Sequence, residues 1–550
     1  MRRLLPSILI LSSCVASPPT APVVAPPPPG LAATGVAQRV VVMTFDGLGA
    51  DALAAQSGLI AFDHLARTGA KARVIPVNPT LTGPTHVSIL TGADPQVHGI
   101  VSNWFHLPST PRQQTARGLN TDIDVETLVE SARRQGKRVG AVPFPTVDGT
   151  TSRRSADFGL VWTNPITQGR VIQLKRVDFK RDWVPPTWTR RPARRTSYST
   201  IMRTRVEWAA SKTLRTDVDV VAYDTTDDRV ENYDTYTIES EDREIAPDSR
   251  GWFAIAKEHH GSWSKVLDAK TSLEVTLYWG AISRTQAYPD AFRDLLDSEA
   301  GFWPGAPDER SAIDSATLMD QIERLSDFLQ RAQTLSIQRM PFDLLLAYQP
   351  VIDETLHNFL GQDENAIRRS YAAADRALAA MGSQLDVSRD ALIVAGDHGL
   401  VPVEREIRIH RFLAEKGFAP RWQAFPANNV GHFYRFEGPD DSAALIEQLS
   451  RSGWFETIER KSATHHRSSG EIIATTFPPV GLSAGSTDPV ESKPSQAGHH
   501  GALNSHRELH AVLLTAGFGT PRGDLGEVSQ TRIARFVSAL LGIDPPRSAE

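Results

Sequence analysis

The chain has 550 residues, 40% of them hydrophobic, so it can bury a large core and is expected to form more than one domain. Its 59 Lys and Arg residues against 64 Asp and Glu residues give a net charge of −5. That balance excludes the strongly basic surface by which proteins hold duplex nucleic acid or an anionic membrane. Beyond the N-terminal segment, no apolar run is long enough to cross a bilayer.

The N-terminal segment is predicted to direct export. Arg2 and Arg3 precede an apolar stretch, and small residues then lead to Cys14, the only cysteine of the chain. This arrangement resembles the lipobox of bacterial lipoproteins, in which the cysteine is lipidated; a plain cleaved signal is the alternative. We therefore expect a lipoprotein-type signal over residues 1–14 and a membrane-anchored protein facing the periplasm or the cell exterior. Residues 15–37 are rich in proline, and such a composition makes an extended linker.

Several mainly apolar runs are predicted to be strands of a sheet that is buried on both faces. They are residues 39–45, 137–142, 342–348, 391–395 and 510–515. Asp46 follows the first run at once, Asp353 and His357 follow the third, and Asp397 and His398 follow the fourth. Because ligands of open α/β sheets bind beyond the carboxyl ends of the strands, we expect these side chains to form a site there.

Helices are expected between the strands, at residues 124–135, 315–335 and 366–382. The alternation predicts an α/β fold with a doubly wound, mostly parallel sheet. Three segments would form this core: 38–165, 313–417 and 486–550. Two stretches break the alternation. Residues 166–312 indicate a mixed α/β insertion that caps the cleft, and residues 418–485 indicate a small α+β insertion.

The stretch from Pro79 to Gly92 is predicted to hold a nucleophile. It is a loop of Thr, Gly and Pro residues that opens onto a short apolar helix, with Pro84 suited to the first turn and Gly92 to the end. Thr82 is therefore expected at a helix N-terminus, where free N–H groups and the positive end of the helix dipole face a ligand. A hydroxyl in that place can attack phosphorus if it is held as an alkoxide.

Asp and His residues that suit Zn²⁺ recur at the predicted strand ends, and six of them divide into two sets of three. They are Asp46, Asp353, His357, Asp397, His398 and His500. Two ions roughly 3.5–4 Å apart can stabilise the attacking and the leaving oxygen of a displacement at phosphorus. Taken singly, each residue has a plainer explanation, such as a helix N-cap, a tight turn or a surface histidine. Those explanations do not account for three such sets in one chain.

The order of these motifs resembles the alkaline phosphatase superfamily, and within it the type I phosphodiesterase/nucleotide pyrophosphatase branch. The resemblance covers residues 39–165, 340–405 and 495–545, about half of the chain. It rests on Asp46-Gly47, Thr82 with His86, Thr91-Gly92, Pro95, His98-Gly99-Ile100, Asn103, Asp353 with His357, Asp397-His398-Gly399 and His500-Gly501.

The resemblance implies an alkaline-phosphatase-type fold and two Zn²⁺ per chain. One ion would take Asp353, His357 and His500, and the other Asp46, Asp397 and His398, with Thr82 beside it. It also implies a two-step hydrolysis of a phosphodiester or pyrophosphate bond in a small molecule, through a phospho-threonine at Thr82. Asn103 would donate to a phosphoryl oxygen together with the Thr82 and Gly83 backbone. His86, His98 and His499 are expected to be structural.

Particular residues depart from the branch or bear on rival functions. Thr85 stands where the branch usually has Asn, and the 166–312 insertion is not common to it. Some phosphomonoesterases of the superfamily carry a Lys-x-Arg pair in the segment that corresponds to residues 142–149. This chain has no basic residue there, and the next ones are Arg153 and Arg154. The absence favours diesters as substrates, and a phosphomonoesterase is the alternative. A sulfatase would need Cys or Ser in place of Thr82. A non-catalytic surface-binding lipoprotein would lack a ligand or the nucleophile, and none is missing.

Overall fold

The computed structural model describes residues 30–183, 193–240, 243–307 and 313–549. The expected export signal, with Cys14, lies outside the described residues, as does most of the proline-rich linker. Within the described ranges, no helix combines the length and the apolar character needed to cross a membrane.

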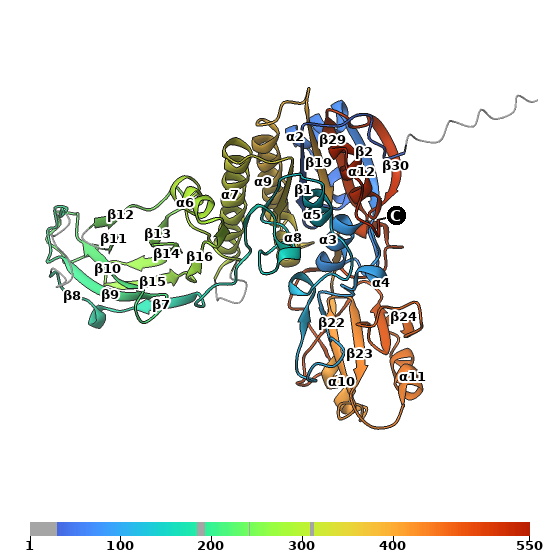
Figure 1. Cartoon of the computed structure of the whole chain (residues 1–550). Helices are drawn as coiled ribbons and strands as arrows, with labels where there is room; N and C mark the ends of the chain where they lie inside the picture. Colours follow the sequence, from blue (N-terminus) through green and yellow to red (C-terminus); the bar gives the residue numbers. More distant parts are fainter. Residues whose placement is uncertain (1–29, 184–192, 241–242, 308–312, 550) are drawn as a thin grey trace, which may run out of the picture.

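A nine-stranded sheet forms the main domain, from which the two insertions extend (Figure 1). In spatial order its strands are β17 (Ala287–Tyr288), β6 (Phe158–Leu160), β5 (Val139–Val142), β18 (Leu344–Gln349), β1 (Arg39–Phe45), β19 (Asp390–Gly396), β29 (Ala511–Gly517), β2 (Ala70–Ile75) and β30 (Gly523–Ser529). The strands from β6 to β19 are mutually parallel. β29, in contrast, is antiparallel to both of its neighbours. The mostly parallel sheet is thus confirmed.

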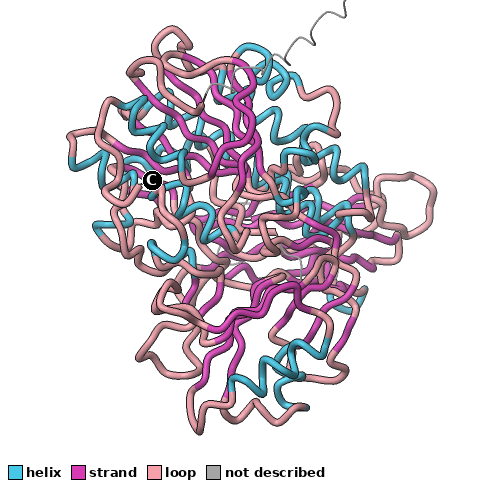
Figure 2. The backbone as a smooth tube through the Cα atoms, turned by 90° about the vertical axis from the view of Figure 1, so that its right-hand side faces the viewer, coloured by secondary structure: helices cyan, strands magenta, loops and turns pink. Residues whose placement is uncertain are grey.

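Helices cover both faces of this sheet, as expected for a doubly wound fold (Figure 2). One core holds residues of α2 (Ile60–Thr68), α6 (Asp290–Glu299), α7 (Ser315–Arg339), α8 (Val351–Phe359) and α9 (Glu364–Gly382), and the other holds residues of α3 (Thr82–Thr91), α5 (Leu128–Arg134) and α12 (Arg532–Leu541). β1 shows why two cores form. Met43 faces the first core and Val42 the second, because side chains alternate along a strand. The short helices α1 (Ala50–Ala54) and α4 (Pro95–His98) lie in loops.

The first insertion is a β-sandwich with its own core, and it extends to the side of the sheet (Figure 1). One of its two sheets has β8 (Lys180–Arg181), β9 (Met202–Ala209), β10 (Arg215–Tyr223), β11 (Thr235–Ser240) and β12 (Arg243–Ile245); the other has β7 (Arg170–Leu174), β13 (Trp252–Lys257), β14 (His260–Lys270), β15 (Glu274–Trp279) and β16 (Ser283–Arg284). The insertion ends earlier than the predicted residue 312, because β17 pairs with β6 and α6 packs in the main core.

Ion pairs and a tryptophan fix this insertion to helix α7. Trp252 Nε1 and Lys265 Nζ lie 3.2 and 3.0 Å from Asp320, and an Arg250 nitrogen lies 3.0 Å from Glu323. The apolar faces of the two sheets are buried against each other. The sandwich therefore has a hydrophobic core of its own, and polar and charged side chains join it to α7. We find it beside the sheet, and not over the cleft as a cap.

The second insertion is the predicted α+β unit, over a slightly longer range (Figure 1). Its elements are β21 (Arg405–Arg408), α10 (Ile409–Glu415), β22 (Trp422–Ala427), β23 (Val430–Arg435), α11 (Ser442–Ser452), β24 (Phe455–Arg460), β25 (Ile472–Thr476), β26 (Val480–Ser483) and β27 (Glu491–Ser492). Two short ladders complete the structure, β3 (Trp104–Phe105) with β4 (Ala116–Arg117), and β20 (Val401–Pro402) with β28 (Gly498–His499).

Candidate active site

Three adjacent strands bring the predicted ligands together. β18, β1 and β19 are neighbours at the centre of the sheet, and all three run in the same direction. Asp46 directly follows β1, the Asp397-His398 pair directly follows β19, and Asp353 lies in the first turn of α8, just after β18. The Asp353 N–H donates to the Asp46 carbonyl at 3.2 Å. The carboxyl ends of these strands therefore form one site.

Asp46, Asp397 and His398 form the first group. One ligand atom from each lies within 4.8 Å of the others. His398 Nε2 is 3.0 Å from Asp397 Oδ2 and 3.4 Å from Asp46 Oδ1. Thr82 Oγ1 is 3.4 Å from the same His398 nitrogen. The structure thus places the predicted nucleophile beside the ligand set that was predicted to accompany it.

Asp353 and His500 form a second group, which shares His398 with the first. His500 Nε2 lies 3.9 Å from Asp353 Oδ1, and the rings of His500 and His398 are stacked with centroids 3.8 Å apart. His357, the third predicted ligand, lies beside this group with its Nε2 3.3 Å from Asp353 Oδ2. Asp353 and His357 share one face of α8, as their spacing of four residues predicts.

Backbone carbonyls orient the three imidazoles. His357 Nδ1 lies 2.8 Å from the Gly498 oxygen, His398 Nδ1 3.2 Å from the Gly399 oxygen, and His500 Nδ1 3.0 Å from the Thr80 oxygen. Because a carbonyl only accepts hydrogen bonds, Nδ1 of each ring carries a proton, so Nε2 is the ring nitrogen that is left for a metal ion. A hydrogen bond from the other ring nitrogen to a carbonyl is typical of histidines that bind a metal ion.

Two carboxylate oxygens at the site have no hydrogen-bond partner among the described residues. Asp46 Oδ1 and Asp353 Oδ1 are buried and accept no hydrogen bond within the described part of the chain. Burial, together with the carboxylates of Asp397 and Asp353, raises the pKa of Asp46 well above its usual value. Burial, together with His398, lowers the pKa of His500 well below its usual value. Oxygen and imidazole donors of this kind fit divalent cations, which would satisfy both orphaned carboxylate oxygens.

Helix α3 carries Thr82 at its first position, and its end is as predicted. Gly92 follows the last turn with a φ of 67°, a left-handed conformation that favours glycine. The Gly83 N–H donates to Asn103 Oδ1 at 2.7 Å, so the Asn103 amide group remains to donate elsewhere. The Gly83 N–H is thus engaged by Asn103 in this structure, and its predicted contact with a phosphoryl oxygen stays a prediction. A side chain at residue 83 would approach Asn103 Oδ1 to 2.9 Å, which explains the glycine.

The remaining polar residues of the motif lie in the packing around α3. Thr80 is fully buried and binds the His500 loop, since its Oγ1 donates to the Ala502 carbonyl at 2.8 Å and accepts from Gly501 N at 3.0 Å. His86 contacts Thr44 Oγ1 at 3.1 Å through Nε2. His98 contacts Ser88 Oγ at 3.1 Å, and His499 is buried in β28. These placements agree with structural roles for the three histidines.

A cavity of about 400 Å³ lies against Thr82, Asp46 and Asp353. Four aromatic side chains form part of its wall, those of Trp104, Phe144, Trp162 and Tyr348. Tyr348 was not predicted. Its hydroxyl donates to Asp46 Oδ2 at 2.7 Å, and the only signal in the sequence is its place at the end of the strand before Asp353. Among the described residues that line the cavity, Arg117 is the single basic one.

Arg153 and Arg154 do not enter this cavity. Arg153 Nε pairs with Glu130 at 2.9 Å, and Arg154 pairs with Asp148. The preceding segment, which has no basic residue, contributes Pro143, Phe144 and Pro145 to the cavity wall. The arrangement leaves space beside the candidate nucleophile and provides no Lys-x-Arg pair there.

The chain matches the sequence model of the type I phosphodiesterase/nucleotide pyrophosphatase family over residues 40–242 and 218–468. A search of curated proteins finds no match. The fold is similar to solved structures of murine and human ectonucleotide pyrophosphatase/phosphodiesterase 5, at 15% and 14% identity and a TM-score of 0.53 for each. In both comparisons the match covers 92% of this chain and 96% of the other. An inactive threonine-to-alanine variant of the murine protein, in complex with AMP, matches equally well.

The family match spans well over half of the chain, and the fold similarity extends over nearly all of it. The motifs that match lie at one edge of the central sheet, where acidic and imidazole side chains meet a threonine at a helix N-terminus. We conclude that the chain belongs to the type I phosphodiesterase/nucleotide pyrophosphatase family of the alkaline phosphatase superfamily and is a hydrolase.

Proposed function

We propose that the protein is an exported two-zinc phosphodiesterase in which Thr82 is the nucleophile. The observation that carries this proposal is the pair of ligand groups that meet at His398, with Thr82 Oγ1 3.4 Å from the shared ring. Asp353, His357 and His500 would hold one ion, and Asp46, Asp397 and His398 the other. Bound there, zinc would act as a Lewis acid that lowers the pKa of the Thr82 hydroxyl and offsets negative charge on the phosphoryl group.

The residues of the chain account for two chemical steps. Thr82 Oγ attacks phosphorus, a new O–P bond forms, and the bond to the leaving group breaks, with the departing oxygen taking up a proton. The Asn103 amide and the N-terminus of α3 donate toward the phosphoryl oxygens. Water then attacks the phospho-threonine, which releases the phosphate monoester and restores the Thr82 hydroxyl.

The proposed substrate class is small phosphodiesters and pyrophosphates, such as nucleotides. The aromatic cavity wall offers faces on which a base can stack. The murine relative was solved with AMP, which supports a nucleotide as one candidate ligand. A diester also needs room for its second ester group, and Pro143, Phe144 and Pro145 leave that room without a basic side chain.

Elemental analysis of the purified protein tests the ligand assignment. We expect two zinc ions per chain, and we expect Asp353→Ala or His500→Ala to lose one ion together with nearly all turnover of bis-p-nitrophenyl phosphate. His64→Ala, an exposed histidine on α2, is the matched control and should retain both ions. Full metal content in both site variants would contradict the assignment.

We propose membrane attachment through a lipidated Cys14, in accord with the basic and apolar residues before it. In a bacterial host, Cys14→Ser should leave the protein unprocessed or release it into the soluble fraction, while the catalytic body keeps its activity. Fractionation followed by immunoblotting measures this. Unchanged membrane attachment of Cys14→Ser would point to another anchor.

A further inference from the structure

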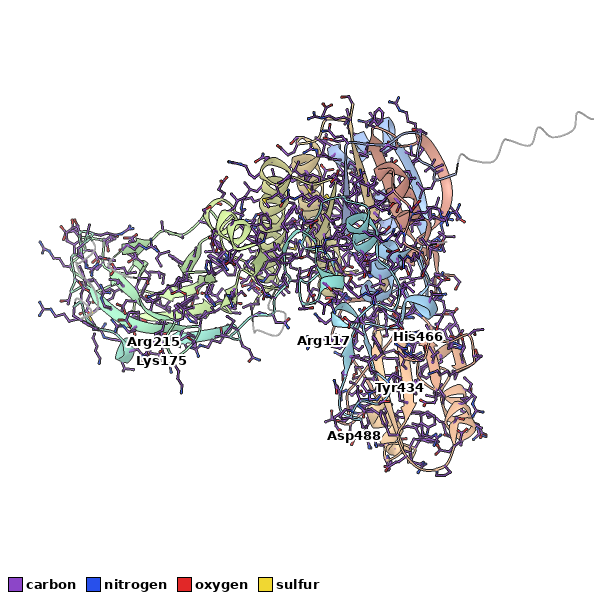
Figure 3. All side chains as sticks on the ribbon, viewed as in Figure 1. Arg117, Lys175, Arg215, Tyr434, His466 and Asp488 are labelled. Carbon is purple, nitrogen blue, oxygen red and sulfur yellow. The ribbon has the colours of Figure 1, made fainter. Side chains whose placement is uncertain are left out.

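A threonine in the wall of the catalytic cavity has an unusual backbone conformation. Thr146 lines the cavity that Thr82 and Asn103 also line, and its φ is 70°. Left-handed values are uncommon for residues other than glycine, and they are least favourable for β-branched side chains. Six non-glycine residues in the described ranges have a positive φ, and Thr146 is the only β-branched one among them. Arg117, another residue of the wall, is labelled in Figure 3 and shows where the cavity lies.

A tight turn imposes this conformation on Thr146. The Val147 N–H donates to the Phe144 carbonyl at 3.0 Å, so Pro145 and Thr146 are the two central residues of a β-turn. Proline at the first central position and a positive φ at the second are the marks of a type II turn, in which glycine normally fills the second position. Thr146 therefore stands where glycine would cause no strain.

Contacts on both sides keep the turn in place. Before it, the Phe144 ring packs edge-on against His86, with centroids 5.5 Å apart. After it, Asp148 pairs with the buried Arg154. Because the segment is fixed before and after Thr146, the backbone cannot relax by a shift of the whole turn.

The hydroxyl group of Thr146 does not compensate for this strain. Its Oγ1 is buried and has no hydrogen-bond partner in the described part of the chain. A left-handed conformation and an unpartnered buried hydroxyl both make the folded state less stable, so folding alone gives no reason for threonine at this turn. The property that remains is the space that the side chain fills in the cavity wall, which glycine would leave open.

We propose that Thr146 is a specificity-determining residue, which limits the size of the ester group that the cavity accepts beside the reacting phosphorus. This inference rests on the proposed function. A single methylene group in a pocket changes the preference between two substrates about 10–200-fold. Removal of the Thr146 side chain frees more space than one methylene group, so bulky ester groups should gain by at least the lower end of this range.

The test uses diesters that share a p-nitrophenolate leaving group and differ in the second ester group, with the metal-loaded full chain. Methyl p-nitrophenyl phosphate is the small substrate, and the p-nitrophenyl ester of thymidine monophosphate is the bulky one. We expect Thr146→Gly to raise the ratio of kcat/KM for the bulky over the small substrate about tenfold or more. Thr146→Val keeps the shape of the side chain without the hydroxyl and should keep the wild-type ratio. An unchanged ratio in Thr146→Gly, or an equal change in Thr146→Val, would overturn the proposal.

Stability separates this role from a purely structural one. Because Thr146→Gly relieves the left-handed strain, its urea midpoint of unfolding should equal or exceed that of wild type. Glu258→Gly is the matched control, since Glu258 is exposed outside the cavity with a φ of 53°, and it should leave the substrate ratio unchanged. A lower midpoint in Thr146→Gly with an unchanged ratio would assign Thr146 to the fold and overturn the proposal.

Binding gives a readout that does not depend on turnover. In a Thr82→Ala background, the affinity for the bulky diester relative to the small one, measured by calorimetry, should rise about tenfold or more when Thr146→Gly is added. Equal relative affinities with and without Thr146→Gly overturn the role of Thr146. If wild type hydrolyses neither diester, the proposed function fails, whereas the binding result still decides the question about Thr146.

Discussion

At the scale of single residues, the site depends on side chains that fix the orientation of the predicted metal ligands. Tyr348 is the clearest case, because its hydroxyl occupies Asp46 Oδ2 at 2.7 Å and leaves Oδ1 to face His398. Its ring packs against His86 and Trp162 at centroid distances of 5.5 and 5.9 Å. The hydroxyl can therefore be removed while the packing of the ring is retained.

We predict that Tyr348→Phe lowers zinc affinity by about 10–100-fold, which is the usual cost of losing a hydrogen bond that orients a metal-binding side chain. Competition with a zinc-buffering chelator measures the affinity. Tyr371→Phe is the matched control, because the Tyr371 hydroxyl is buried in α9 and has no hydrogen-bond partner in the described part of the chain. Equal zinc affinity in Tyr348→Phe and wild type would show that Asp46 needs no such support.

The sequence predicted the candidate ligands but not Tyr348, and the reason is physical. Asp46 and Asp397 immediately follow runs that are apolar on both faces, so their residue types and positions mark a site without any tertiary information. Tyr348 meets Asp46 only when β18 lies beside β1. The spacing of residues along the chain does not show which strands will be neighbours in the sheet.

At the scale of elements, helix α3 is defined at both ends by features that the sequence showed. Its C-terminus rests on Gly92, and an added Cβ there would meet Ala549 Cβ at 2.7 Å. Gly453 ends α11 with a similar φ of 71°, but nothing lies within 4 Å of its Cβ position. The two glycines thus separate the cost of the backbone conformation from the cost of crowding.

We predict that Gly453→Ala destabilises its domain by about 1–2 kcal/mol through the left-handed conformation alone. Gly92→Ala should cost about 1–3 kcal/mol more, because the C-terminal segment around Ala549 must move. Urea unfolding followed by circular dichroism measures both. Equal losses in the two variants would contradict the contact between α3 and the C-terminal segment.

Elements with strong local signals were predicted well, and those set by pairing partners were not. The predicted helix at 124–135 begins later, at α5, because Thr127 and Glu130 form a capping box that fixes the start. The run at 510–515 is a strand, but its direction is opposite to that of β19. The direction of a strand in the sheet depends on the end from which the chain enters it, and the sequence of the strand itself does not indicate that.

At the scale of the whole molecule, the two insertions are placed differently relative to the candidate active site. The β-sandwich stands to the side (Figure 1), and the chain leading into it contributes Trp162 and Asn164 to the cavity wall. The second insertion, from β21 to β27, lies between His398 and His500 in the sequence. It packs directly beside α3, since Phe425 and Tyr434 share a hydrophobic cluster with Val87. The second insertion thus packs against the helix that carries Thr82.

The central claim is that this molecule hydrolyses diesters by way of Thr82, and the preference between diester and monoester tests it most directly. A monoester brings roughly one more negative charge than a diester, and a site that prefers it needs a further cation at the phosphoryl oxygens. Arg153 and Arg154 are engaged by Glu130 and Asp148, so neither side chain supplies that cation.

The measurement is the ratio of kcat/KM for bis-p-nitrophenyl phosphate to that for p-nitrophenyl phosphate, on one metal-loaded preparation. Thr82→Ala serves as the blank, and it should bind metal yet lose about 10³-fold or more of the turnover. We predict a ratio above about ten, with activity that disappears in Thr82→Ala. A ratio below about one tenth, or turnover that survives in Thr82→Ala, would contradict the account.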